Sequence, residues 1–153
     1  MSVLGTRRFQ RVMVAVDGSE SAKRALQVGV DLTMMLKAEL TILHIIEIPT
    51  SIYFPTEPIE VDVDKIQGRE LNEGEKLVSK AASLAESKGA KAKQMVMRHM
   101  GSVSEGIREY ADKNGIDLII VGTRGLGGVK RLVFSNVAGG VVSNANCSVL
   151  VVR

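Results

Sequence analysis

Short runs of β-branched and aliphatic residues alternate along this chain with longer segments of helical periodicity. Apolar runs in which polar residues do not alternate with apolar ones are typical of strands buried on both faces, as in parallel sheets covered by helices. The alternation therefore predicts an α/β protein. With 153 residues the chain has the size of one domain, expected to span residues 1–153.

The apolar runs predict five strands. They are expected at Arg11 to Val16, Leu40 to Ile46, Ala92 to Met97, Asp117 to Val121 and Ser148 to Val152. Parallel neighbours need long crossover connections, and these are almost always right-handed. A Rossmann-like, doubly wound, five-stranded parallel sheet with strand order 3-2-1-4-5 is the most economical arrangement.

Capping residues mark where the intervening helices begin and end. Ser19 offers an N-cap after the first predicted strand, and Ser102 with Glu105 has the spacing of a capping box. The longest helix is expected from about residue 63 to residue 88, with Gly89 as its C-terminal stop. The last helix is expected at about residues 136–144.

Charge and cysteine content exclude several classes of protein. The 20 Lys and Arg against 17 Asp and Glu give a net charge of only +3, without a convincing basic cluster, so a small anion is a better partner than nucleic acid. Cys147 is the single cysteine, so an intrachain disulfide is impossible and the cytoplasm is the expected location. Polar residues interrupt every long apolar stretch, so neither a signal peptide nor a membrane span is predicted.

A glycine-rich stretch after the fourth predicted strand carries the parts of a phosphate site. It reads GTRGLGGVKRLVFSN from Gly122 to Asn136. Glycines let a ligand approach the backbone, and the following helix offers free amides at its N-terminus. The stretch is not a Walker A loop, and the Rossmann fingerprint fails because Lys130 stands in place of the third glycine. Doubly wound sheets bind ligands where the winding reverses, so the loops after strands one and four form the candidate site.

The sequence resembles the universal stress proteins along its whole length, in VAVDGSE, LHII, DLIIVGTRGLGG and CSVLVVR. The nucleotide-binding branch of that family carries Gly, two residues, Gly, nine residues, then Gly and Ser or Thr. Gly122 and Gly125 match this pattern, whereas Ser135-Asn136 stand where the closing Gly-Ser pair is expected. The resemblance implies a site for ATP or a related adenine nucleotide, with or without Mg²⁺. Ser and Asn side chains keep the capacity to donate hydrogen bonds to phosphate.

The resemblance also implies a role for each matching position. Ala15, Val16 and Asp17 would line the pocket after strand one, Ile45 would pack on the adenine, and Val121 with Gly122 would border the base and ribose. The phosphates would be surrounded by Arg124, Gly125, Ser135, Asn136 and Val137. A bulkier residue at Gly122 or Gly125 is expected to block the ligand and leave the fold intact.

Purely structural interpretations exist for several of these residues. Asp17 can shape an Asp-Gly turn, and Ser135 or Asn136 can cap the last helix. His44 and His99 have no neighbours at metal-ligand spacing and are interpreted as structural, so no metal site is predicted. The methionines, among them Met34, Met35 and Met100, are expected to pack within the fold.

Three functions remain open. The first is adenine nucleotide binding in a stress response or in signalling through an unidentified protein partner; the second is a dimeric interaction protein of the same fold that binds no nucleotide. The third is an enzyme, either a slow ATPase or a nucleotide-transfer relative, for which the sequence supplies no general base. A receiver domain is excluded because Arg98-His99-Met100 stand where the phospho-accepting Asp is required.

The last strand predicts a homodimer. Val149 to Val152 form an apolar strand at the predicted edge of the sheet, where unpaired backbone groups can join a second copy. Members of the resembling family also associate through this strand. Neither nucleic acid nor a membrane is expected as a partner.

Overall fold

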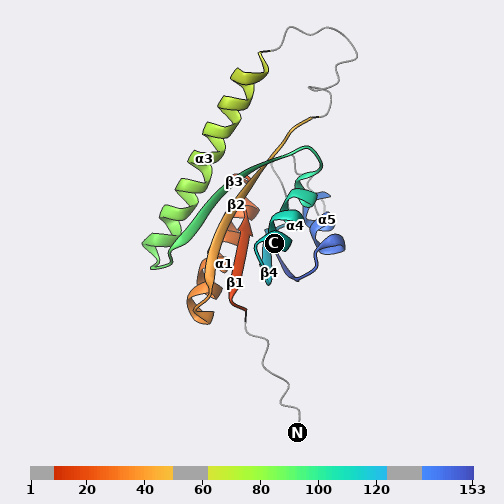
Figure 1. The fold of residues 1–153 in the computed structure, drawn as a ribbon. Coiled ribbons are helices and arrows are strands. Elements are labelled where there is room, and N and C mark those ends of the chain that lie inside the picture. The colour runs from red at the N-terminus through yellow and green to blue at the C-terminus, as the bar shows by residue number, and fades with distance from the viewer. Residues whose placement is uncertain (1–8, 50–61, 124–135) are drawn as a thin grey trace.

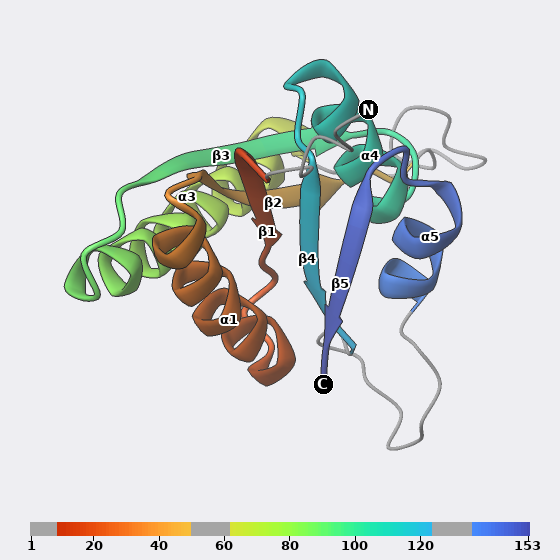
Figure 2. The same ribbon diagram turned by 90° about the horizontal axis from the view of Figure 1, so that it is seen from below.

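The structure is a computed structural model that describes residues 9–49, 62–123 and 136–153. They form one parallel sheet with helices on both faces (Figures 1 and 2). The sheet has five strands in the order β3-β2-β1-β4-β5, so the predicted fold class and strand order are confirmed. The strands are β1 (Arg11–Ala15), β2 (Glu39–Glu47), β3 (Ala92–His99), β4 (Leu118–Gly122) and β5 (Ser148–Val152). The helices are α1 (Glu20–Leu36), α3 (Val63–Ser87), α4 (Val103–Lys113) and α5 (Asn136–Asn144).

Strands β2 and β3 extend beyond the apolar runs that predicted them. They pair in parallel from Leu40 beside Ala92 to Glu47 beside His99. Continued pairing satisfies backbone N–H and C=O groups even where the side chains are polar. The polar residues at the end of β3 concealed this extension in the sequence.

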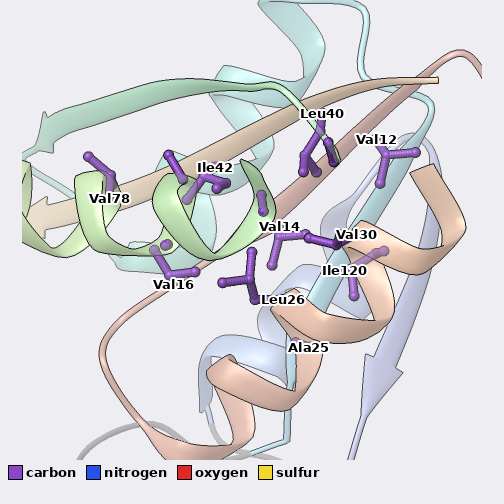
Figure 3. Close-up of a cluster of buried hydrophobic side chains, with 14 of the residues drawn as sticks. Val12, Val14, Val16, Ala25, Leu26, Val30, Leu40, Ile42, Val78 and Ile120 are labelled. Carbon is purple, nitrogen blue, oxygen red and sulfur yellow. The ribbon is translucent and has the colours of Figure 1, made fainter. Parts of the chain in front are cut away.

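Alternate residues of the strands build two cores, one on each face of the sheet. Val12, Val14 and Ile42 belong to the core beneath α1 and α3, where they meet Leu26 and Val78 (Figure 3). The residues between them in the strands, such as Met13, Leu43 and Ile119, pack beneath α4 and α5. This division follows from the two-residue period of a strand.

The predicted helix boundaries agree closely with the structure. Ser19 and Ser102 are N-caps, and Ser102 forms the predicted capping box with Glu105. Gly89 follows α3 with a φ of +91°, a left-handed conformation that glycine adopts without strain.

The expectation that the methionines pack within the fold is wrong for three of them. Met34, Met35 and Met100 are 47%, 78% and 54% exposed. The first two lie in the last turn of α1, and Met100 lies in the turn between β3 and α4. Met34 and Met35 lie outside the buried face of α1, to which Leu26, Val30 and Thr33 belong.

None of the helices formed by residues 9–49, 62–123 and 136–153 combines the length and apolar content needed to cross a membrane.

Candidate functional site

A cavity of about 110 Å³ opens where the winding of the sheet reverses, between β1 and β4. It is lined by Ala15, Val16, Asp17, Ser19, Ala22, Leu43, His44, Ile45, Val103, Ile107, Val121, Gly122 and Val137. These residues come from the ends of β1 and β4, from β2, and from α1, α4 and α5. Open parallel sheets bind ligands at this position.

The walls of the cavity are mainly aliphatic. Ile45, Ile107 and Val121 are 6%, 1% and 3% exposed, and all three belong to the core beneath α4 and α5. Asp17 and His44 are the ionisable residues among those that line it. An apolar pocket with a few polar groups at its edge suits a flat, largely apolar ring.

Asp17 both lines the cavity and shapes the turn that follows β1. Its Oδ1 accepts a hydrogen bond of 2.9 Å from the backbone N–H of Ser19. Ser19 in turn caps α1, since its Oγ accepts from the N–H of Ala22 at 3.2 Å. The structural and the site interpretations of Asp17 are therefore compatible.

His44 holds the backbone of this turn from the neighbouring strand. Its Nδ1 lies 2.8 Å from the carbonyl oxygen of Val16, and because a carbonyl can only accept, Nδ1 is the donor. The N–H of Val16 donates to the carbonyl of Leu43 at 2.9 Å. Both contacts fix Val16, which lies just beyond β1, against β2.

Gly122 is needed for packing between β4 and α1. A Cβ at this position would lie 2.6 Å from the carbonyl carbon of Ser21 and 2.7 Å from its oxygen. The expectation that a bulkier residue at Gly122 leaves the fold intact is therefore wrong. The main chain of Ser21 would have to move first.

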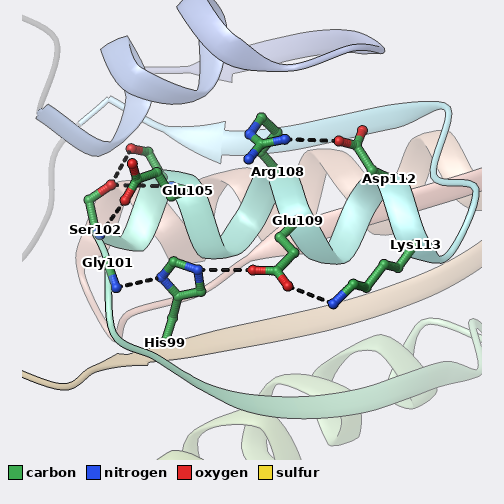
Figure 4. Close-up of polar contacts among 9 residues, drawn as sticks. His99, Gly101, Ser102, Glu105, Arg108, Glu109, Asp112 and Lys113 are labelled. Atoms are coloured by element: carbon green, nitrogen blue, oxygen red, sulfur yellow. Dashed lines mark hydrogen bonds and ion pairs between the residues drawn. The ribbon is translucent and has the colours of Figure 1, made fainter.

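Helix α4 brings Val103 and Ile107 to the cavity, and its first turn is held by the capping box shown in Figure 4. The N–H of Ser102 donates to Glu105 Oε2 at 2.8 Å, and the N–H of Glu105 donates to Ser102 Oγ at 3.3 Å. The hydrogen bond from the Ser102 backbone is the main cause of a lowered pKa of the Glu105 carboxyl.

A chain of polar contacts ties the end of β3 to the same helix (Figure 4). The N–H of Gly101 donates to His99 Nδ1 at 2.9 Å, so the other ring nitrogen carries the proton. That nitrogen, Nε2, lies 3.0 Å from Glu109 Oε2, and Glu109 Oε1 accepts from Lys113 Nζ at 2.6 Å. Hydrogen bonds from Lys113, then from His99, lower the pKa of Glu109.

The cavity brings together many of the residues predicted from the sequence. Those that line it are Ala15, Val16, Asp17, Ile45, Val121, Gly122 and Val137. Arg124, Gly125 and Ser135 lie outside the described residues. Asn136 is the first residue of α5, so the N-terminal turn of this helix lies next to the cavity through Val137.

Sequence reasoning missed six lining residues. They are Ser19, Ala22, Leu43, His44, Val103 and Ile107. A signal for two of them was present, since Val103 and Ile107 are four residues apart on one face of the helix that begins at the capping box. Their distance in sequence from the glycine-rich stretch concealed their part in the site.

No group of three or more His, Cys, Asp or Glu within the described residues is arranged to hold a metal ion. Cys147 is partly buried, and this burial raises the pKa of its thiol.

The fold and the cavity define a doubly wound α/β protein with a cavity at its topological switch point. The chain belongs to the universal stress protein family, whose model matches residues 8–153. It is 33% identical over 153 residues to the universal stress protein YxiE of Bacillus subtilis (strain 168), a match that covers 95% of this chain and 99% of that protein.

Solved structures with the name of this family share the fold. The universal stress protein UspA of Lactobacillus plantarum matches with a TM-score of 0.77 and 22% identity, over 95% of this chain and 99% of its own. A universal stress protein of Archaeoglobus fulgidus, solved in complex with dAMP, matches with a TM-score of 0.67 and 21% identity, over 95% and 99% of the two chains.

Proposed function

We propose that this protein binds ATP or a related adenine nucleotide in the cavity between β1 and β4 and acts in a stress response or in signalling. The observation that carries the proposal is an aliphatic cavity at the switch point, with the N-terminal turn of α5 beside it. The Archaeoglobus fulgidus relative was solved with dAMP, and two other structures of the family were solved with cAMP and AMP.

The size and lining of the cavity favour the base as the part of the ligand that enters it. Pockets for whole drug-sized ligands measure roughly 300–1,000 Å³, whereas this cavity measures about 110 Å³. We expect the adenine ring to lie between Ile45 and Val121, with Ala15, Val16 and Asp17 at its edge. The ribose and phosphates would then extend outward past Gly122.

The phosphates are expected to lie at the start of α5. A helix N-terminus presents free N–H groups and a partial positive charge, both of which favour an anion. Val137 places this turn at the cavity. Arg124, Gly125, Ser135 and Asn136 are the further residues that we expect around the phosphates, and Mg²⁺, if present, would be held mainly by the phosphates.

Nucleotide analysis of the purified protein after denaturation, followed by calorimetry with ATP, AMP and GTP, tests the proposal. ATP at about one hundred times its dissociation constant should stabilise the fold by roughly 2.7 kcal/mol. GTP at the same concentration is the control for recognition of the adenine base. Titrations with and without Mg²⁺ test whether the ion contributes to binding. No released nucleotide and no binding at millimolar ATP would leave the nucleotide-free interaction protein as the function.

We further propose a homodimer through β5 and a cytoplasmic location. Strand β5 pairs with β4 and lies at the end of the sheet, so its other side is available to a second copy. The single cysteine, Cys147, is unpaired, as suits a reducing compartment.

A further inference from the structure

A second hollow, of about 410 Å³, lies at the amino-terminal ends of the strands, opposite the end where the cavity lies. Arg11, Thr41 and Lys93 line it from the amino-terminal parts of β1, β2 and β3, and Tyr110 and Lys113 line it from the last turns of α4. Lys113 is visible in Figure 4 at the far end of α4 from Ser102. None of the described residues lines both this hollow and the cavity at the carboxyl ends of the strands.

Two residues that line this hollow carry a hydroxyl group without a hydrogen-bond partner among the described residues. Thr41 and Tyr110 are 8% and 6% exposed, and neither hydroxyl forms a hydrogen bond with the described residues. Every fully buried side-chain nitrogen or oxygen of the described residues does have a partner. Neither hydroxyl oxygen is therefore fully buried, and both residues line the hollow. A nearly buried hydroxyl without a partner is unfavourable, so a ligand that accepts its hydrogen bond gains free energy.

The charged residues around these hydroxyls favour an anion. The lining includes three cations, Arg11, Lys93 and Lys113, against one carboxylate, Glu39. Arg11 Nε lies 3.5 Å from Glu39 Oε2, so these two residues form an ion pair. Lys113 forms an ion pair with Glu109, which lies outside the hollow. Lys93 has no ion-pair partner within residues 9–49, 62–123 and 136–153. Its ammonium group is thus available to a ligand.

The C-terminal end of α4 carries partial negative charge, which by itself would repel an anion. Two of its terminal carbonyl groups and that of the C-cap residue Asn114 accept hydrogen bonds, however. The carbonyl of Tyr110 accepts from the backbone N–H and from Nδ2 of Asn114, and that of Ala111 accepts from Ile116. The carbonyl of Asn114 accepts from Arg11 Nη1 at 3.4 Å. These hydrogen bonds occupy part of the negative end of the helix, and the three cations of the lining add positive charge beside it.

We propose that this hollow binds a small oxyanion of phosphate size, through the hydroxyls of Thr41 and Tyr110 and the ammonium group of Lys93. The oxyanion is either free phosphate or the phosphate group of a larger molecule, because both present the same acceptor oxygens. Hydrogen bonds to a charged acceptor are stronger than those between neutral groups. The site is independent of nucleotide binding at the switch point.

The experiment is an NMR titration of the full-length protein with inorganic phosphate at constant ionic strength, with chloride as the control anion. Saturable shifts are expected at the amides of Thr41, Lys93 and Tyr110. Thr41→Val and Tyr110→Phe remove each hydroxyl and nearly preserve side-chain shape. Each should weaken phosphate binding about tenfold or more and leave the melting temperature unchanged or raised, since no protein hydrogen bond is lost. Thr33→Val is the matched structural control, because the Thr33 hydroxyl donates to the Gly29 carbonyl.

A second titration, with glycerol phosphate, separates the two sources of the oxyanion. Tighter binding than that of inorganic phosphate assigns the site to a larger phosphorylated molecule, and equal or weaker binding assigns it to the free ion. Shifts that do not saturate, or that persist unchanged in the Thr41→Val and Tyr110→Phe variants, mean an adventitious ion only and overturn the proposal.

Discussion

His99 Nε2 lies 3.0 Å from Glu109 Oε2, and this contact joins the end of β3 to the middle of α4. The same helix brings Val103 and Ile107 to the candidate nucleotide cavity. The position of one wall of the cavity is thus linked to a pair of side chains that sit outside it.

Glu109→Gln should lower the free energy of unfolding at pH 7. Lys113 and His99 hold the pKa of Glu109 below its ordinary value of 4.5, so the carboxylate stabilises the fold fully above that pH. This contribution disappears as the pH falls through the lowered pKa. Urea unfolding of both proteins from pH 7 to pH 3 should therefore show a difference that shrinks toward the acid end.

Glu75→Gln is the control for the Glu109 experiment. Glu75 is exposed on α3 and forms no ion pair with the described residues. Its replacement should leave the pH profile close to that of the wild type. A Glu109→Gln profile parallel to the wild type down to pH 3 would contradict the assigned role.

Gly122→Ala should destabilise the protein by about 1–3 kcal/mol, the usual cost of overpacking. The added Cβ would lie 2.6 Å from the carbonyl carbon of Ser21. Gly68→Ala, in the interior of α3, is the matched control because nothing lies within 4 Å of the added atom there. That change should stabilise the protein by about 0.5–1 kcal/mol. Thermal unfolding of the two variants should give shifts of opposite sign.

Val137→Phe should weaken adenine nucleotide binding about tenfold or more, since the larger side chain would occupy part of the cavity beside α5. Val142→Phe is the control on the same helix, where the side chain is 53% exposed. Calorimetry with ATP should show a loss of affinity for the Val137→Phe variant only. Equal affinities for the two variants would place the nucleotide elsewhere.

Light scattering should report a mass near twice 16.5 kDa if β5 joins two copies. Replacing Leu150 and Val152 with Lys should give monomers, because like charges would face each other across the two-fold axis. Both side chains also pack partly on the core beneath α1 and α3, so circular dichroism must show that the variant is folded. A folded variant that stays dimeric, or a monomeric wild type, would disprove this interface.

The sequence alone determined the class of fold and the order of its elements. Uninterrupted apolar runs such as Leu118 to Val121 required burial on both faces, and capping residues such as Ser19 and Ser102 placed the helix starts within a residue or two. These features are readable because they depend on neighbours a few positions apart. The end of β3 was missed because pairing with β2, not side-chain character, extends it to His99.

The tertiary structure alone decided which distant residues share a site. Val103 and Ile107 share the cavity with Ile45 and Val121 only because the sheet order places β4 beside β1 and because α4 packs on β2. Gly122 lines the cavity, and only its close approach to Ser21 shows that packing also requires a glycine there. Thr41 and Tyr110 gave no signal at all, because the lack of a partner for a hydroxyl group depends on every atom around it and not on its sequence neighbours.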